Sequence, residues 1–291
     1  MKKYPVAILG SGNIGTDLLI KIQRSKYLKC IVFTGRSNNS QGMKKAISLD
    51  VNCSNKSIDY IINHKDKIDL VFDATSAKAH KIHAPLLLKN GIIAIDLTPS
   101  KIGEMTVPAV NLDECINEMN INMVSCGGQA SIPLASAIGK TQKDIEYIET
   151  VSSISSKSAG PATRSNIDEY IATTEEGIKK FTGVKLSKAI LNINPAVPCI
   201  DMQTTVFAKI DKPDMDALNS ELYLYIKKIK TYVPGYELLA KPLFENGRII
   251  IMVRVKGLGD YLPDYAGNLD IINCAAIAIA EEYAKSANIN Q

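Results

Sequence analysis

The sequence lacks tryptophan, has only three histidines, and contains no long hydrophobic run. Its longest internal apolar run, residues 274–280, is far shorter than the ~20 apolar residues that cross a bilayer as a helix. Two lysines near the N-terminus precede a short apolar stretch, residues 6–9, which is too brief for a secretory signal peptide. We therefore expect a cytoplasmic protein that does not enter a membrane.

Charge and cysteine spacing exclude two further kinds of site. The net charge is only +4, and no cluster of basic and aromatic residues suits a nucleic-acid strand. The six cysteines include no pair at C-x-x-C spacing, and none of the histidines lies near a cysteine in the sequence. Because structural zinc needs clustered ligands, we expect no metal site and no nucleic-acid partner.

The N-terminal stretch has the pattern of a dinucleotide-binding fold. Residues 5–9 form a short apolar run typical of a buried strand, residues 10–15 carry the pattern G-x-G-x-x-G, and residues 16–24 have helical apolar spacing. The three glycines permit a tight turn, leave room for a pyrophosphate and let the helix pack closely on the strand. The N-terminus of that helix would face the phosphates with free N–H groups and its positive dipole end.

The alternation of strands and helices continues to about residue 125. It predicts an α/β fold, with a Rossmann-type doubly wound parallel sheet over residues 1–125 that a C-terminal helix at 269–291 completes. Residues 126–268 are predicted to form a second, α+β domain, and a chain of 291 residues has room for both. The expected elements are strands at residues 28–33, 70–74, 92–95, 121–125, 147–155, 204–210 and 248–255, and helices at 42–49, 80–89, 112–119, 166–180 and 213–229.

The loop after the second predicted strand departs from the usual NAD pattern. In that pattern an Asp or Glu at the strand end holds the adenosine ribose hydroxyls. Residues 34–40 contain no carboxylate, and Arg36 is flanked by small hydroxyl and amide residues that suit a 2′-phosphate. The loop leaves both NAD and NADP open as the cofactor. A third alternative is that Arg36 stacks on adenine or points to water.

Cys126 is the strongest candidate for a nucleophile. It follows the strand predicted at 121–125, and Gly127, Gly128 and Pro133 come after it, which is typical of a sharp strand-to-helix turn. A thiol at the positive end of a helix is expected to have a lowered pKa, and neighbouring N–H groups can receive an oxyanion. The alternative is a buried cysteine that only packs inside the turn.

Residues 125–133 closely resemble the active-site segment of the acylating acetaldehyde dehydrogenases. Further segments resemble the same family and occur in its order from end to end of the chain, which is not expected of chance matches. These segments are residues 10–16, 72–77, 95–99, 158–166 and 260–270.

The resemblance implies an oxidoreductase that converts a short-chain aldehyde, coenzyme A and NAD(P)⁺ to acyl-coenzyme A and NAD(P)H. Cys126 would be the catalytic nucleophile, and the second domain would also make the protein a homodimer. Family enzymes often work bound to a pyruvate-type aldolase that makes the aldehyde, so such an aldolase is a candidate partner. The resemblance and the Arg36 loop together predict these cofactor-binding residues: Ser11, Gly12, Asn13, Ile14, Gly15, Thr16, Arg36, Ser158, Ala159, Gly160, Pro161, Ala162, Thr163, Arg164, Ser165, Asn166 and Asn268.

One segment departs from the family pattern. Family members tend to have an Arg-Asp-Thr run whose Asp is associated with activating the thiol or a water, but residues 201–205 have no carboxylate at the matching place. Asp201 lies nearby, out of register, so no general base is assigned. Two other functions stay open: a semialdehyde dehydrogenase with phosphate as acyl acceptor, and a non-catalytic dinucleotide-binding subunit in which Cys126 is inert.

Overall fold

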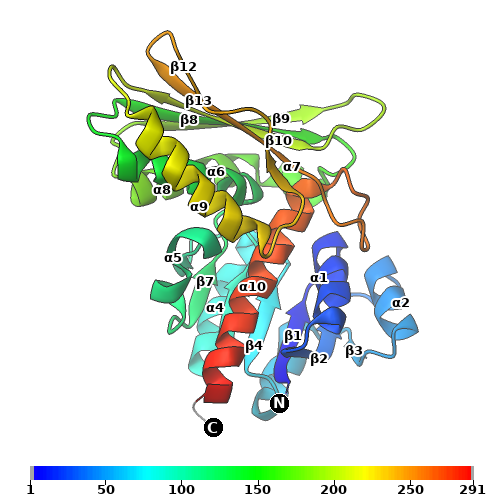
Figure 1. The fold of residues 1–291 in the computed structure, drawn as a ribbon. Coiled ribbons are helices and arrows are strands. Elements are labelled where there is room, and N and C mark those ends of the chain that lie inside the picture. The colour runs from blue at the N-terminus through cyan, green and yellow to red at the C-terminus, as the bar shows by residue number, and fades with distance from the viewer. Residues whose placement is uncertain (1–2, 290–291) are drawn as a thin grey trace.

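A computed structural model of the chain describes residues 3–289. Residues 1, 2, 290 and 291, which belong to the ends of the predicted first domain, lie outside the described part. Two sheets make up the framework, one above the other in Figure 1, and the helix α10 (Gly267–Ile289) runs from one to the other.

The first sheet is parallel, and its strands follow the order β3-β2-β1-β4-β5-β7-β6. The strand order reverses beside β1, as in a doubly wound sheet, and such sheets bind ligands at the carboxyl ends of their strands. The strands are β1 (Tyr4–Leu9), β2 (Leu28–Thr34), β3 (Cys53–Ser54), β4 (Leu70–Asp73), β5 (Ile93–Asp96), β6 (Glu104–Met105) and β7 (Asn120–Asn122).

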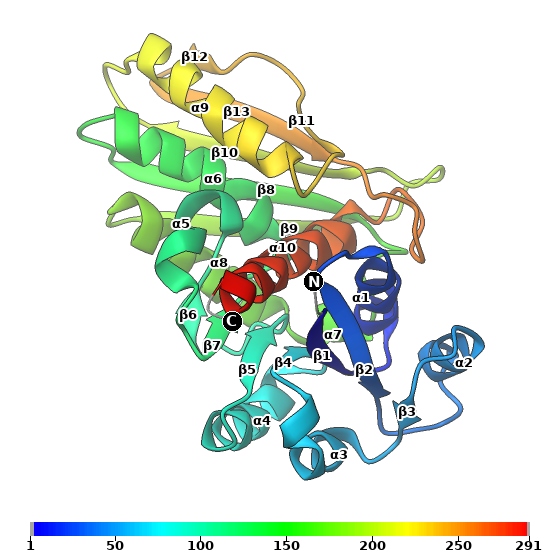
Figure 2. The ribbon, with the colours of Figure 1, turned by 60° about the horizontal axis from the view of Figure 1, so that its bottom comes forward.

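Helices cover both faces of this sheet. Val6 and Ile8 of β1 belong to a core shared with α1 and α10, whereas Ala7 and Leu9 pack toward α3 and α4 on the opposite face (Figure 2). All four side chains are fully buried, as a central parallel strand requires. The helices of this part are α1 (Asn13–Arg24), α2 (Gln41–Ser48), α3 (Ser57–Asn63), α4 (Ala77–Lys89) and α5 (Pro108–Cys115), with a 3₁₀ turn at Lys65–Lys67.

The second sheet is mixed, with the order β11-β13-β10-β8-β9 and β12 paired to β13. Only β8 and β9 are parallel neighbours; the other pairs are antiparallel. Its strands are β8 (Tyr147–Ser155), β9 (Ser187–Asn194), β10 (Met202–Lys209), β11 (Tyr236–Leu238), β12 (Leu243–Glu245) and β13 (Arg248–Val255), and its helices are α6 (Cys126–Thr141), α7 (Pro161–Ser165), α8 (Ile167–Thr182) and α9 (Met215–Lys230).

The long helices of the second domain lie on one face of this sheet, and no described element covers the other face (Figure 1). The alternation along β13 follows from this arrangement. Ile249, Ile251 and Val253 are fully buried toward the helices, whereas Ile250 and Met252 are only partly buried on the open face. An antiparallel strand with one covered face has this period of two.

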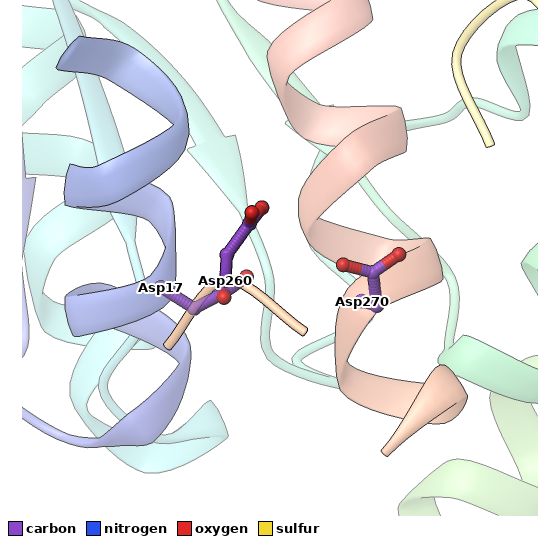
Figure 3. Close-up of side chains that lie close together, drawn as sticks. All are labelled: Asp17, Asp260 and Asp270. Atoms are coloured by element: carbon purple, nitrogen blue, oxygen red, sulfur yellow. The ribbon is translucent and has the colours of Figure 1, made fainter. Parts of the chain in front are cut away.

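A buried charge cluster ties α10 to α1. Lys21 Nζ lies 3.1 Å from Asp17, 2.8 Å from Asp260 and 2.7 Å from Asp270. Figure 3 shows these three carboxylates, which come from α1, from the loop before α10 and from α10 itself. Because the Lys21 ammonium contacts all three, the cluster is an internal ion network that fixes the first turn of α10 against α1.

The predicted fold class is confirmed, with local differences in several elements. The strand expected at 121–125 ends at Asn122, because Val124 has a φ of +60°, outside the range of strands. The helix expected at 112–119 begins earlier, at Pro108, a residue suited to a first helical turn. β9 was not predicted, since it is an edge strand in which polar residues interrupt the apolar ones. Within residues 3–289, no helix is long and apolar enough to span a membrane.

Candidate active site

A cleft with a volume of about 600 Å³ lies at the carboxyl ends of the parallel strands, beside the second sheet. Its walls come from the glycine loop at residues 10–14, the loops after β2, β4 and β5, and the N-terminus of α6. Residues of the segment 158–166 and the first turn of α10 close the other side. Parts of the chain from both sheets therefore meet in one cavity.

The glycine loop has the geometry of a pyrophosphate cradle. Gly10 has a φ of +119°, and a Cβ there would lie 2.5 Å from the Ala74 carbonyl oxygen. A Cβ on Gly15 would lie 2.0 Å from the Gly10 oxygen, so only glycine lets α1 pack this close to β1. A Cβ on Gly12, in contrast, would point into open space, and Gly12 is the N-cap of α1. The free N–H groups at this helix end suit a phosphate group.

The loop after β2 forms the far end of the cleft. Gly35 packs on the glycine loop, where a Cβ would lie 2.4 Å from Ser11 Oγ, and Ser40 Oγ donates to Ser11 Oγ at 3.0 Å. Arg36 follows, exposed to solvent and lining the cleft. The guanidinium is thus placed at the edge of the cavity, near the end of β2 where an adenosine ribose binds in this fold.

Two buried carboxylates hold the loops after β4 and β5. Asp73 Oδ1 accepts from the Thr75 hydroxyl at 2.5 Å, and Asp73 Oδ2 accepts from His80 Nδ1 at 2.9 Å and His83 Nδ1 at 2.8 Å. Burial alone would raise the pKa of Asp73, but the two histidines lower it to about 2. The second carboxylate, Asp96, accepts from the Thr98 backbone N–H at 2.8 Å. These contacts fix the loop backbones that border the cleft.

Cys126 is the first residue of α6 and lies at a sharp turn. Val124, two residues before Cys126, has a φ of +60°, a strained conformation for a β-branched residue. The Val124 N–H donates to Asn122 Oδ1 at 2.8 Å. Ser125 caps the helix by accepting from the Gly128 N–H at 2.8 Å, and its hydroxyl lies 2.7 Å from Thr174 Oγ1 of α8. The turn is therefore held from β7 and from α8 together.

The two glycines after Cys126 are required by close neighbours. A Cβ on Gly127 would lie 1.8 Å from the Tyr170 hydroxyl oxygen, and a Cβ on Gly128 would lie 2.7 Å from Val124 Cγ1. Tyr170 comes from α8 and lines the cleft together with Cys126. The glycines thus serve close packing around the thiol as well as access to it.

The predicted lowering of the Cys126 pKa is wrong. Burial raises the pKa of the thiol to about 12, although the backbone N–H groups of Gly127 and of Cys126 itself act in the opposite direction. The physical reason is that a thiolate loses more hydration at this site than the helix end returns. Cys126 nevertheless lines the cleft, and the residue as a whole is only partly buried.

The segment 158–166 contributes one side of the cleft through part of its residues. Arg164 turns away, with Nε donating to the Ala159 carbonyl oxygen at 3.0 Å and Nη2 to Ser156 Oγ at 3.0 Å. The predicted cofactor-binding residues that line the cleft are Ser11, Gly12, Asn13, Ile14, Arg36, Ser158, Gly160, Pro161, Thr163, Asn166 and Asn268. Those outside the lining are Gly15, Thr16, Ala159, Arg164 and Ser165, and the side chain of Ala162 is not among the described ones.

Asn268 offers buried polar atoms to the cleft. The residue is 1% exposed, and neither its Nδ2 nor its Oδ1 has a hydrogen-bond partner among residues 3–289. Thr98 also lines the cleft, and its buried Oγ1 likewise has no hydrogen-bond partner among the described residues. Buried polar groups without partners are rare, and a ligand with amide and hydroxyl groups would satisfy both. Together with the glycine cradle, these atoms fit a dinucleotide.

Several cleft residues were not predicted from the sequence. They include Tyr170 and Ile272. Tyr170 follows Asn166 by four residues within the helix predicted at 166–180, and that spacing was the available signal. In the segment with the Arg-Asp-Thr departure, Asp201 does not line the cleft, and no Asp or Glu does so within the described chain.

The fold and the glycine cradle match a known class of protein. Residues 5–112 match the family described as "Semialdehyde dehydrogenase, NAD binding domain". A solved structure, aspartate semialdehyde dehydrogenase II from Vibrio cholerae complexed with ASA, has the same fold with a TM-score of 0.60 at 14% identity, covering 95% of this chain and 97% of that one. The class is a two-sheet oxidoreductase with a Rossmann-type NAD-binding domain.

The particular family follows from the rest of the chain. Residues 126–263 match the family described as "Prokaryotic acetaldehyde dehydrogenase, dimerisation". Relatives named acetaldehyde dehydrogenase include one from Spirochaeta aurantia, 64% identical over 99% of this chain and 97% of that protein. Another, from Pectobacterium atrosepticum, is 54% identical over 96% of this chain and 95% of that protein. The chain belongs to the prokaryotic acetaldehyde dehydrogenase family.

Proposed function

We propose that the protein is an acylating aldehyde dehydrogenase that converts a short-chain aldehyde, coenzyme A and NAD(P)⁺ to acyl-coenzyme A and NAD(P)H. One observation carries the proposal: Cys126 lies at the start of α6 in the same cleft as the glycine loop and Asn268. Aldehyde oxidation through a covalent thioester needs a nucleophile beside a dinucleotide. The names of the relatives support acetaldehyde or a close homologue as the substrate.

In the proposed reaction, the Cys126 thiolate forms a bond to the aldehyde carbon, and the aldehyde oxygen takes the negative charge. The backbone N–H groups of Cys126 and Gly127 face the sulfur and favour its thiolate form, which is the attacking group. The glycine loop, Asn268 and Thr98 would hold a nicotinamide dinucleotide whose oxidised ring would supply the hydride acceptor, and Cys126 would then carry the acyl group as a thioester. The thiolate of coenzyme A then attacks the thioester carbon, the bond to Cys126 breaks, and Cys126 returns as a thiolate.

The cleft residues would hold the dinucleotide in two parts. The glycine loop and the N-terminus of α1 suit its pyrophosphate, because Gly12 faces open space there. Asn268 and Thr98, with their unpartnered buried atoms, suit the polar groups of the nicotinamide half. Arg36 would meet the adenosine end, where a 2′-phosphate distinguishes NADP from NAD.

We also propose that two copies of the chain form a homodimer through the open face of the second sheet. The matched dimerisation family spans residues 126–263, which include that sheet. On the open face, Val151, Thr205 and Met252 are register neighbours on three adjacent strands, and Ile250 lies beside Phe207. A pyruvate-type aldolase stays a predicted partner, which co-purification with this chain would test.

Mass spectrometry of the protein after exposure to acetyl-coenzyme A tests the proposed function. We expect an acetyl adduct on Cys126 that is absent from Cys126→Ala and retained in Cys199→Ala, since Cys199 does not line the cleft. An acetyl group spread over several cysteines, or found on none, would contradict a nucleophilic Cys126. A steady-state requirement for phosphate in place of coenzyme A would support the semialdehyde dehydrogenase alternative.

A further inference from the structure

A row of hydroxyl groups leads from the second sheet to the Cys126 turn. Tyr170 of α8 is 7% exposed, lines the cleft with Cys126, and has its hydroxyl oxygen directly against the Gly127 backbone, as the 1.8 Å to a Cβ there demonstrates. The same Cβ would lie 3.1 Å from Ser152 Oγ of β8. Ser152 Oγ lies 3.0 Å from Thr204 Oγ1 of β10.

The directions of these hydrogen bonds determine whether the hydroxyl proton of Tyr170 is available to the cleft. Burial has the largest effect on the pKa of Tyr170 and raises it, as does negative charge at Cys126, whereas the Ser152 side chain and the Gly127 N–H act to lower it. Either hydroxyl of the Ser152–Thr204 pair can be the donor, and when Thr204 donates, the Ser152 proton is free to be donated to the Tyr170 oxygen. A phenol oxygen that accepts from two donors still carries its own proton, and that proton is the one left for the cleft.

Few other titratable or charged side chains line the cleft near Cys126. The titratable or charged side chains among the cleft-lining residues, besides Cys126 and Tyr170, are Arg36 and His83. Arg36 belongs to the β2 loop at the edge of the cavity, and His83 Nδ1 is bound to Asp73. The Tyr170 hydroxyl oxygen lies directly against Gly127, the residue after Cys126, and both Tyr170 and Cys126 line the cleft.

We infer that the Tyr170 hydroxyl, held in place by Ser152 and Thr204, donates a hydrogen bond to the negative charge that develops where Cys126 attacks a carbonyl carbon. The inference rests on the proposed function and adds a side-chain donor to it. Ser152 and Thr204 are positioning residues, since they act through Tyr170. The phenol stays protonated throughout and stabilises charge; it does not remove the thiol proton.

Acylation of Cys126 by p-nitrophenyl acetate tests the inference without aldehyde, coenzyme A or cofactor. Attack by the thiolate releases p-nitrophenolate, and the acetyl group on Cys126 is located by peptide mass spectrometry. We expect Tyr170→Phe, which keeps the ring, to lower the acylation rate constant about tenfold, because a charge-assisted hydrogen bond is lost. The matched control is Tyr225→Phe on α9, a buried tyrosine outside the cleft lining, which should stay within about twofold of the wild type.

A double-mutant cycle tests the row behind Tyr170. Thr204→Val should lower the rate constant about threefold in the wild-type background and should add nothing to Tyr170→Phe, because it acts through that hydroxyl. A Tyr170→Phe rate constant equal to that of the wild type, in a protein with unchanged thermal unfolding, would overturn the inference and leave the proposed function standing. A wild-type protein acetylated elsewhere but not at Cys126 would overturn the proposed function itself.

Discussion

At the residue scale, Cys126 combines the first turn of a helix with a position where burial disfavours negative charge. Its pKa is raised to about 12, so below that pH the thiolate fraction increases about tenfold for each unit by which the pH rises. We therefore predict that alkylation of Cys126 by iodoacetamide accelerates steadily from pH 7 to pH 10. Peptide mass spectrometry with Cys126→Ala as the blank measures this, and a rate that levels off below pH 9 would contradict the raised pKa.

The positive charge of an oxidised nicotinamide ring should also favour the thiolate form of Cys126. A positive charge within about 4–6 Å of a thiolate favours the ionised form by one pKa unit or more. Saturating NAD⁺ should therefore speed the alkylation of Cys126 at pH 8 by about tenfold. NADH, with its uncharged ring, is the matched control ligand. Equal rates with both ligands would mean that the ring does not reach the sulfur.

The second prediction at this scale concerns the choice of cofactor. Arg36 is the exposed cation at the cleft edge, and the β2 loop offers no carboxylate to a ribose diol. We predict that Arg36→Ala lowers kcat/KM for NADP⁺ about tenfold and changes that for NAD⁺ less than twofold. Lys45→Ala, an exposed cation on α2, is the control for general charge effects. Equal losses with both cofactors would show that Arg36 contacts a part that they share.

At the scale of elements, the site separates into parts that local sequence predicts and parts that packing creates. The glycine loop and the Cys126 turn were predictable, because glycine spacing encodes both turns locally. Tyr170 was not, because its approach to Gly127 depends on how α8 packs against α6. The raised pKa of Cys126 escaped prediction for the same reason, since desolvation comes from neighbours that are distant in the sequence.

The buried ion network between α1 and α10 should contribute to the stability of the fold. Lys21 is the shared counter-charge of Asp17, Asp260 and Asp270, which are nearly inaccessible to water. We predict that Lys21→Met lowers the free energy of unfolding at pH 7 by about 3–5 kcal/mol, because it leaves buried carboxylates unpaired. Urea unfolding measures the loss. Lys285→Met, at an exposed pair with Glu282, should cost less than about 1 kcal/mol.

The pH dependence of this loss has a defined sign. Burial raises the pKa of Asp270 above its unfolded value, so the native state binds a proton more tightly than the unfolded state does. Without Lys21 that difference grows, and native stability then rises as the pH falls toward the unfolded pKa. The deficit of Lys21→Met should therefore shrink between pH 7 and pH 5. A deficit that stays constant over this range would mean that the carboxylates find other partners.

At the scale of the whole molecule, the two sheets have different surroundings. Helices cover both faces of the first sheet, whereas the second has helices on one face only (Figure 1). Its open face carries apolar side chains on the central strands, among them Val151, Phe207, Ile250 and Met252, all partly buried in the single chain. An apolar sheet face at this position fits a two-fold interface between identical chains, in which each residue meets the same patch.

The last prediction tests that interface. Met252→Asp places a charge at the centre of the open face, where dimer formation would bury it without a partner, so we expect a monomer in sedimentation velocity at micromolar concentration. Tyr223→Asp introduces the same charge at a side chain that is 67% exposed on α9, on the helical side, and should leave the dimer intact. If Met252→Asp stays dimeric while Tyr223→Asp dissociates, the copies meet through the helices and the open face has another role.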